Sequence, residues 1–428
     1  MKQRELGFFF ILAFFALFMT ACASKPQTIA TETESEQLPP ATIPQSAEEN
    51  RTESVQAYID KMSVEELIGQ LFIIDLRKPG AGDPYQTMND DIRREFASVH
   101  PGGVILFGGN LRSPKQTREL ITQLQQLSAI GLFITTDEEG GPISRLNYSP
   151  LMSPGTMPSA EKIGATKDTS NAYTAGKIIG RQLKSLGINM NNAPDADVLT
   201  NPKNPVIGPR SYGNDPRLVG RMASAFLEGL SEEGVIGVMK HFPGHGDTMS
   251  DSHSGAVYVH RSEEQLSEIE LVPFEIGINN DAKAIMTGHI TNPEIDGLPA
   301  TFSNKLLNEV LRKSMSYNGV IISDSMAMGA IARYWTSAEA AVRALNAGID
   351  MLLIPDDLAQ AYQGVLLAVK NGTLELHVVR EKVRRILLLK AEYGILDKSD
   401  VYPDESAAFV FPEIEEFRKR IEAMDVSE

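Results

Sequence analysis

The sequence predicts an α/β protein built as a (β/α)8 barrel of the TIM type. Short apolar runs alternate with amphipathic helical patterns about eight times, as in a parallel sheet that is covered by helices. Polar residues follow several of these runs at their carboxyl ends, where barrel enzymes carry their active sites. No GxGxxG motif follows a predicted strand, which disfavours an open nucleotide-binding sheet.

The elements follow in order from these patterns. The predicted strands are 71–76, 103–107, 132–136, 188–192, 235–239, 284–287, 320–322 and 351–354. Helical periodicity lies between most of them, at 116–127, 171–186, 218–233 and 338–347, and two more helices are expected at 359–370 and 374–392. Ser63 and Glu66 have capping-box spacing before the first strand, as do Thr336 and Glu339 before the helix at 338–347. The acidic segment after Pro412 is expected either to pack on the barrel or to fray.

The N-terminus carries an export signal. Lys2 and Arg4 precede an apolar run at 6–19, which is too short to span a membrane comfortably and fits the core of a signal peptide. Small residues then lead to Cys22 and resemble the lipobox of bacterial lipoproteins, in which the cysteine is lipidated. The alternative is an ordinary signal peptide or anchor with an incidental cysteine.

These segments divide the chain into four parts. We expect a lipoprotein signal peptide at 1–21, a lipidated cysteine with a disordered tether rich in Ser, Thr, Pro, Gln and Glu at 22–52, a single catalytic barrel at 53–396, and a C-terminal tail at 397–428. The folded part would then work outside the cytoplasm, anchored by lipid to the periplasmic or extracellular face of a bacterial cell envelope. A net charge of −16 argues against nucleic acid or an anionic membrane surface as a partner. Because Cys22 is the only cysteine, no internal disulfide can form and stability must come from the core, which a chain with 42% apolar residues can supply.

The polar residues at the strand ends form one set. They are Asp75, Asp137, the pair Lys240-His241, His289 and Asp324, with Asp197 and Arg210 in the longer loop after the fourth strand. Taken singly, each of these residues could equally well cap a helix or form a hydrogen bond within a loop. Together, on one rim of a barrel, they predict a binding or catalytic site.

The stretch 240–253 is the strongest local signal. It follows an apolar run directly and contains three histidines, one lysine and two aspartates among Pro and Gly residues. Three interpretations apply: a polar surface loop, a metal site formed by His241, His245, Asp247, Asp251 and His253, or an acid–base pair of Asp251 with His253. The spacings do not fit HExxH or a Cys/His zinc pattern. The local sequence leaves the choice between metal and acid–base chemistry open.

Further motifs resemble bacterial family 3 glycoside hydrolases, in their β-N-acetylglucosaminidase branch, over residues 54–396. The segments that carry the resemblance are 62–72, 101–110, the Asp-x-Glu-Gly-Gly motif within 136–141, 204–213, the loop 240–253 and the strand with its continuation at 322–326. Three positions depart from the family pattern. Pro142 stands where Arg is common, Glu138 where Gln or His is common, and Asp195 where an apolar residue is usual.

The resemblance implies a retaining exo-β-N-acetylglucosaminidase. Asp324 corresponds to the nucleophile, and His253 with Asp251 to an acid/base dyad; the family needs no metal and no cofactor. The matching substrate-binding positions are Asp137, Arg145, Arg210, Lys240 and His241. The implied substrates are peptidoglycan fragments that end in N-acetylglucosamine, with chitooligosaccharides second, and we expect a monomer.

Alternatives within the enzymes are a family 3 β-glucosidase and a β-N-acetylglucosaminide phosphorylase, because a neutral imidazole would also admit an anionic acceptor. The Asp251–His253 pair argues against the glucosidase. An inactive glycan-binding lipoprotein is the alternative from another class, against which the intact Asp324, Asp251 and His253 argue. A metal-dependent hydrolase would lose its activity in chelator, and we expect no such loss.

Overall fold

The structure is a computed structural model that describes residues 45–78, 82–249, 255–404 and 406–425. The predicted signal peptide, Cys22, Asp251 and His253 lie outside the described residues. Within those residues, none of the helices combines the length and the apolar character needed to cross a bilayer.

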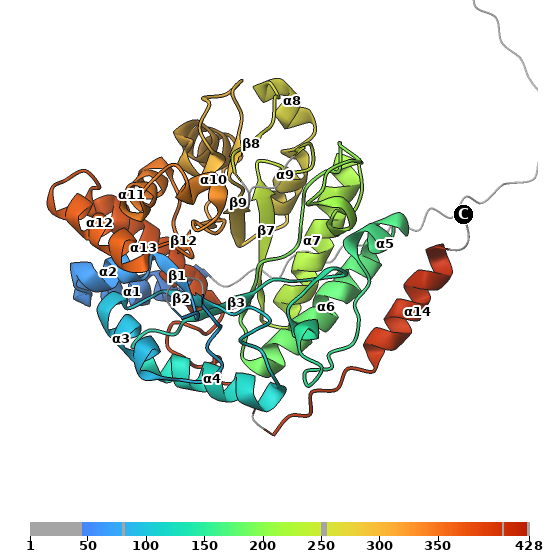
Figure 1. The fold of residues 1–428 in the computed structure, drawn as a ribbon, viewed down its shortest axis with the longest axis horizontal. Coiled ribbons are helices and arrows are strands. Elements are labelled where there is room, and N and C mark those ends of the chain that lie inside the picture. Colours follow the sequence, from blue (N-terminus) through green and yellow to red (C-terminus); the bar gives the residue numbers. More distant parts are fainter. Residues whose placement is uncertain (1–44, 79–81, 250–254, 405, 426–428) are drawn as a thin grey trace, which may run out of the picture. The chain divides into compact units, whose positions relative to one another are not determined.

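Eight parallel strands form the barrel, and all eight overlap the predicted runs (Figure 1). They are β1 (Phe72–Asp75), β2 (Gly103–Ile105), β3 (Phe133–Thr136), β6 (Met190–Asn191), β7 (Ile236–Phe242), β9 (Ala284–Thr287), β11 (Val320–Ser323) and β12 (Leu352–Leu353). Their order is β11-β9-β7-β6-β3-β2-β1-β12, and a parallel bridge between Ile322 and Met351 joins the two end strands. The predicted (β/α)8 fold is therefore confirmed.

Helices surround the strands. Those between successive strands include α3 (Asp90–Val99), α4 (Pro114–Leu127), α5 (Ala160–Ala165), α6 (Thr169–Leu186), α7 (Pro216–Glu232), α8 (Glu263–Glu268), α9 (Val272–Asn279), the π-helix η4 (Lys305–Ser314), α10 (Gly329–Ala332) and α11 (Ser337–Ala347). Before β1 lie α1 (Gln45–Lys61) and α2 (Val64–Gly69), and after β12 lie α12 (Leu358–Lys370), α13 (Leu376–Glu392) and α14 (Glu413–Asp425). Short 3-10 turns η1 (Leu146–Tyr148), η2 (Gly208–Arg210) and η3 (Ala300–Phe302) complete the loops.

Local chemistry explains where several helices begin. Ser63 with Glu66, and Thr336 with Glu339, form the two predicted capping boxes, each with both reciprocal hydrogen bonds. Asp215 caps α7 by accepting hydrogen bonds from the backbone N–H groups of Arg217 and Leu218. These caps satisfy N–H groups that a helix cannot pair internally.

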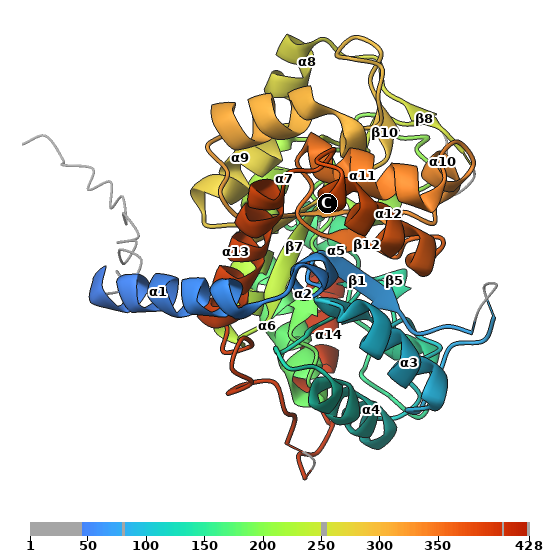
Figure 2. The same cartoon turned by 90° about the vertical axis from the view of Figure 1, so that its left-hand side faces the viewer.

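One boundary differs from the prediction, and one of two stated alternatives is found at the C-terminal end. The last residues of the predicted tether, 45–52, are helical, because α1 packs against α13 and buries Val55 and Ile59 (Figure 2). The segment after Pro412 packs as α14, which contacts α5 and buries Ile414, Phe417 and Ile421. Tertiary packing stabilises both helices, whose sequences are largely polar.

The amino-terminal end of the barrel carries a buried ionic cluster. Asp350, which is fully buried just before β12, accepts hydrogen bonds from the backbone N–H of Ile321 at 2.9 Å and from Nε of Arg385 at 3.0 Å. Arg312 binds Oδ2 of Asp350, the oxygen that also accepts the N–H of Ile321. This cluster joins β11, β12, η4 and α13, and it lies at the end of the strands opposite to the polar rim.

Candidate active site

A cavity of about 410 Å³ opens at the carboxyl ends of the barrel strands. All five predicted substrate-binding residues and the predicted nucleophile Asp324 line it. The polar side chains come from the segment 137–145, which contains β4 (Glu138–Gly140), from β7, from the loop before α7 and from the residue that follows β11. Apolar side chains, including Phe107, Met328 and Ile354, line other parts of the wall. Such a two-sided lining suits a ring that has both hydroxyl groups and an apolar face.

Asp324 follows β11 directly and is rigidly placed. Its backbone N–H donates to the carbonyl oxygen of Thr287 at 3.0 Å, and its Oδ1 accepts the N–H of Ser325 at 2.7 Å. His289 bonds to the carbonyl oxygen of Ser325 at 2.9 Å through Nε2, and to Thr301 at 2.8 Å through Nδ1. His289 therefore supports the segment that carries Asp324 and does not line the cavity.

The Asp137-Glu138-Glu139 segment places three carboxyl groups differently. Asp137 faces the cavity and accepts a hydrogen bond from Nη2 of Arg145 at 2.8 Å. Burial disfavours its charged form, but Lys240 and Arg145 outweigh burial and hold the pKa of Asp137 below its usual value. Glu138 points away from the cavity and accepts the N–H groups of Arg145 and Leu146. Burial raises the pKa of Glu138 to about 7.

Glu139 is the centre of the ionic network. Its carboxylate accepts Nε and Nη2 of Arg210 at 2.8 and 2.9 Å, and its Oε1 lies 2.6 Å from Nζ of Lys240. Although burial opposes ionisation, the charges of Lys240 and Arg210 hold the pKa of Glu139 far below its usual value. In the sequence, Glu139 stands out only as the Glu of the Asp-x-Glu-Gly-Gly motif. The available signal was its spacing from Asp137, because residues two apart in an extended segment face the same side.

Strand β7 carries both Lys240 and His241 into the cavity. The sequence placed this pair just past the strand, but β7 runs on to Phe242. The register between β7 and β9 shifts between Met239 and Phe242, an irregularity of the kind that re-aims side chains near active sites. This shift lets two consecutive side chains face the same cavity. Lys240 contacts Glu139 and Asp137.

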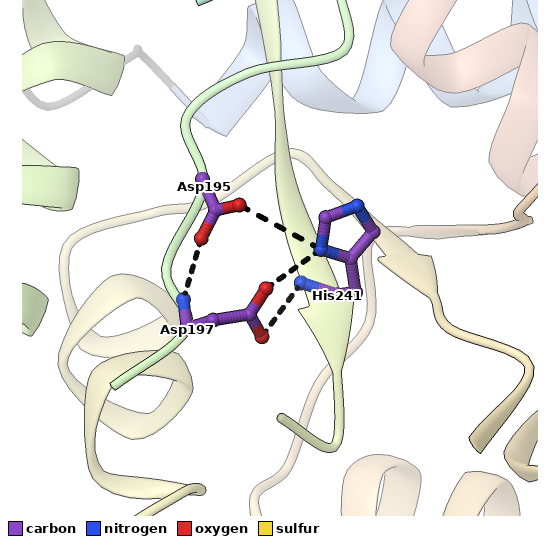
Figure 3. Close-up of side chains that lie close together, drawn as sticks. All are labelled: Asp195, Asp197 and His241. Atoms are coloured by element: carbon purple, nitrogen blue, oxygen red, sulfur yellow. Dashed lines mark hydrogen bonds and ion pairs between the residues drawn. The ribbon is translucent and has the colours of Figure 1, made fainter. Parts of the chain in front are cut away.

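His241 rests on two aspartates from the segment after β6 (Figure 3). Its Nδ1 lies 2.7 Å from Oδ2 of Asp197 and 3.9 Å from Oδ2 of Asp195. Oδ1 of Asp197 also accepts the backbone N–H groups of His241 and His245, at 3.3 and 2.6 Å. Burial, with the charge of Arg210, lowers the pKa of His241 to about 4, so the imidazole is neutral at physiological pH. A proton on Nδ1 that is donated to Asp197 leaves Nε2 as an acceptor, and Nη2 of Arg210 lies 3.4 Å from it.

Asp195, Asp197 and His241 also bring three metal-binding atoms within 4.8 Å of one another. The Nδ1–Oδ2 separation of 2.7 Å is that of a hydrogen bond, whereas two ligands of one tetrahedral zinc ion lie about 3.3 Å apart. Arg210 also contacts Oδ2 of Asp195 at 3.3 Å. These distances describe a hydrogen-bonded ionic cluster better than a preformed metal site.

The base of the predicted catalytic loop is held by another ionic cluster. Arg261 lies 3.1 Å from Oδ1 of Asp247 and 3.3 Å from Oε1 of the buried Glu270. Thr200 also donates a hydrogen bond to Oδ1 of Asp247 at 3.0 Å. Asp247 and Arg261 flank the chain segment that contains Asp251 and His253, whose own positions lie outside the described residues.

The remaining predicted rim residues have other partners. Asp75 pairs with Arg77, and of these two only Arg77 lines the cavity. Two arginines lie against the ring of Phe107. The Cζ atom of Arg77 is 5.7 Å from the ring centroid, and that of Arg145 is 5.5 Å from it. Arg77 and Phe107 were not predicted as site residues. Both follow strand ends, and position in the sequence does not distinguish them from other loop residues.

Comparisons with known proteins agree with this architecture. Residues 63–389 match the glycosyl hydrolase family 3 N-terminal domain. A beta-hexosaminidase A from Pseudoalteromonas piscicida is 33% identical over 325 residues; the match covers 69% of this chain and 54% of that protein, so the chain spans about half of this relative's length.

Two solved structures are also similar. A family 3 β-N-acetylglucosaminidase from Paenibacillus sp. str. FPU-7 superposes with a TM-score of 0.79 and 34% identity, covering 85% of this chain and 69% of that one. A β-glucoside phosphorylase gives a TM-score of 0.79 with 25% identity, and covers 90% and 68% of the two chains.

Proposed function

The chain belongs to glycosyl hydrolase family 3, and from this premise we propose that it is a retaining exo-β-N-acetylglucosaminidase. The observation that carries the proposal is the cavity in which Asp324 faces the buried Glu139–Arg210–Lys240 network, at the carboxyl ends of the barrel strands. Likeness to a beta-hexosaminidase and to a β-N-acetylglucosaminidase supports the choice of sugar. The substrates that we propose are peptidoglycan fragments with a terminal β-linked N-acetylglucosamine, with chitooligosaccharides second.

The proposed reaction uses two steps. An oxygen of Asp324 attacks the anomeric carbon as the glycosidic C–O bond breaks, and His253 gives its proton to the departing oxygen. His253 then takes a proton from water, whose oxygen attacks the anomeric carbon and releases Asp324. Asp251 would orient the imidazole of His253.

The polar wall would bind the sugar hydroxyl groups. Asp137 can accept hydrogen bonds, while Arg145, Arg210 and Lys240 can donate them, and the paired charges keep each group oriented before the sugar arrives. His241 is neutral, so it can share a hydrogen bond with a hydroxyl group through Nε2 without adding charge. Specificity for one hydroxyl arrangement follows because any hydroxyl group that is missing would leave buried polar groups unpaired.

The test is release of a chromogenic phenol from its β-N-acetylglucosaminide by a soluble chain that starts at Gln45. We expect turnover that is lost in Asp324→Ala and greatly reduced in His253→Ala, with little turnover of the matching β-glucoside. Added phosphate distinguishes a phosphorylase, which would release sugar 1-phosphate, and a chelator should leave the rate unchanged. An absence of turnover on every sugar would favour the inactive glycan-binding lipoprotein.

We also propose that the protein is a monomer held at the bacterial cell envelope by lipid on Cys22. The apolar run at 6–19 and the small residues before Cys22 support the anchor. Labelled palmitate should enter the full-length chain and fail to enter Cys22→Ser, which should appear in the soluble fraction. Equal labelling of both chains would refute the anchor. Gel filtration of the chain from Gln45 tests the monomer.

A further inference from the structure

Asp195 is a fully enclosed carboxyl group that the reaction above does not use. It departs from the family pattern, is 2% exposed, and does not line the cavity. Its backbone is fixed against β7, because Ala196 donates to the carbonyl oxygen of Lys240 at 2.6 Å and Lys240 donates to that of Pro194 at 3.1 Å. Asp195 is therefore held firmly below the two β7 residues that face the sugar.

The side chain of Asp195 lies against Arg210. Its Oδ1 accepts the N–H of Asp197 at 3.0 Å, and its Oδ2 lies 3.3 Å from Nη2 of Arg210. Glu139 binds Nε and Nη2 of the same guanidinium. Two carboxyl groups from distant parts of the chain therefore hold Arg210, which cannot rotate without losing at least one of them.

The charges around Asp195 favour its neutral form. A neutral Asp195 can contact Arg210 without cancelling the positive charge of the guanidinium. The network beside the cavity has three cations, Arg145, Arg210 and Lys240, and four carboxyl groups, Asp137, Glu139, Asp195 and Asp197, of which Arg145 and Asp137 are partly exposed. An unbalanced buried charge is costly, so one carboxyl group should keep its proton. Burial, with the charge of Asp197, raises the pKa of Asp195 well above its usual value, and burial also raises the pKa of Asp197, so this pair of carboxyl groups favours keeping a proton. A neutral carboxyl group still offers Nη2 of Arg210 a polar contact, at 3.3 Å from Oδ2.

We propose that Asp195 is a positioning residue: it fixes Nη2 of Arg210 beside Nε2 of His241, so that these two groups meet the bound sugar as one preformed pair. Nη2 of Arg210 lies 3.4 Å from Nε2 of His241. This inference rests on the proposed function, because it assigns to Arg210 and His241 a shared role in binding the sugar. Asp195 itself touches neither the sugar nor the reacting atoms.

Two substitutions of graded severity test the role of the two carboxyl oxygens of Asp195. Asp195→Val removes both, and Asp195→Asn keeps one carbonyl oxygen in the same volume. We expect Asp195→Val to lower kcat/KM by about ten- to a hundredfold, as for the loss of a polar contact to a charged group, with Asp195→Asn between it and the parent. The change should fall mainly on KM, because Arg210 would bind the sugar both before and during the reaction. An effect on kcat alone would contradict the proposal.

A double-mutant cycle with Arg210→Lys tests whether Asp195 acts through Arg210. Lysine keeps the charge but cannot form the two-pronged contact with Glu139, so the guanidinium that Asp195 would position is gone. In this background Asp195→Val should change KM by less than about twofold, because residues that act as a unit are not additive. An undiminished effect of Asp195→Val in the Arg210→Lys background would overturn the proposal.

Asp350→Asn is the matched control, because Asp350 is also a buried aspartate that holds arginines but lies at the opposite end of the barrel. It should lower the melting temperature and leave KM unchanged. If both aspartate variants lower the melting temperature and neither changes KM, Asp195 is merely structural. If the parent chain shows no turnover, the proposed function fails; if the parent is active and the Asp195 variants match it, only this inference fails.

Discussion

Nζ of Lys240 lies 2.6 Å from Oε1 of Glu139, and both side chains are 5% exposed. The same carboxylate holds Arg210 through two further hydrogen bonds. One acidic group thus aligns two cations that come from β7 and from the loop before α7. This arrangement makes Glu139 the common support of the polar wall.

Glu139→Gln should therefore weaken activity more than a lost sugar contact would. The neutral amide cannot balance two cations, so we expect kcat/KM to fall by at least about a hundredfold and the free energy of unfolding to fall by roughly 3 kcal/mol. Steady-state kinetics and urea unfolding measure both. Glu119→Gln is the control, because Glu119 pairs with Lys115 at 3.8 Å on an exposed helix face. Equal behaviour of the two variants would disprove the central role of Glu139.

Glu138 predicts a dependence of stability on pH. Burial raises its pKa to about 7 from the model-peptide value of 4.5, so between these values the folded state holds a proton that the unfolded state has released. Stability that comes from Glu138 is therefore full below pH 4.5 and declines as the pH rises towards 7, by roughly 3 kcal/mol in total. Glu138→Gln should remove this decline, since its amide oxygen can still accept the N–H groups of Arg145 and Leu146.

Urea unfolding at several pH values checks this prediction as the difference between the parent chain and Glu138→Gln. The parent should lose stability relative to the variant as the pH rises from 4.5 to 7. Glu161→Gln, an exposed substitution on α5, provides the baseline. A difference that stays constant over this range would show that the folded chain does not retain the proton on Glu138.

Arg261→Ala should loosen the base of the predicted catalytic loop. The substitution removes the cation beside the buried Glu270 and breaks the contact with Asp247. We expect the free energy of unfolding to fall by about 2–3 kcal/mol, because a buried carboxyl group is left without its partner. A lower kcat should accompany this loss of stability if Asp247 helps to place His253. Arg261→Lys should restore part of the stability and part of kcat. Arg217→Ala, at an exposed position on α7, is the control; stability equal to that of the control would argue against the cluster.

Ile59→Ala tests whether α1 belongs to the folded domain. Ile59 is 2% exposed on a helix that packs against α13. Its truncation should lower the free energy of unfolding by about 2–4 kcal/mol, as for other buried large-to-small changes. Thermal melts of the chain from Gln45 measure the effect against Lys61→Ala, an exposed substitution on the same helix. Melting temperatures that coincide would show that α1 does not contribute to the folded domain.

The barrel, and the rim on which the site is built, could be predicted from the sequence alone. Strand runs, helical periodicity and capping boxes are local patterns, so eight strands and the helices between them could be predicted from short segments. The strand ends likewise marked Asp137, Lys240, His241 and Asp324, all of which line the cavity. The tether boundary was wrong because α1 is largely polar, and only its packing on α13 shows that it is folded.

Which charged side chains contact each other depends on the folded arrangement of distant segments. Glu139 lies about 70 residues from Arg210 and about 100 from Lys240 along the chain, and no local pattern measures such a separation. Asp195 and Arg210 meet because β6 and β7 are neighbours in the barrel and the loop before α7 folds back over them. Burial then sets the protonation of His241, Glu138 and Asp195, since removal from water penalises charge according to the partners that the fold supplies.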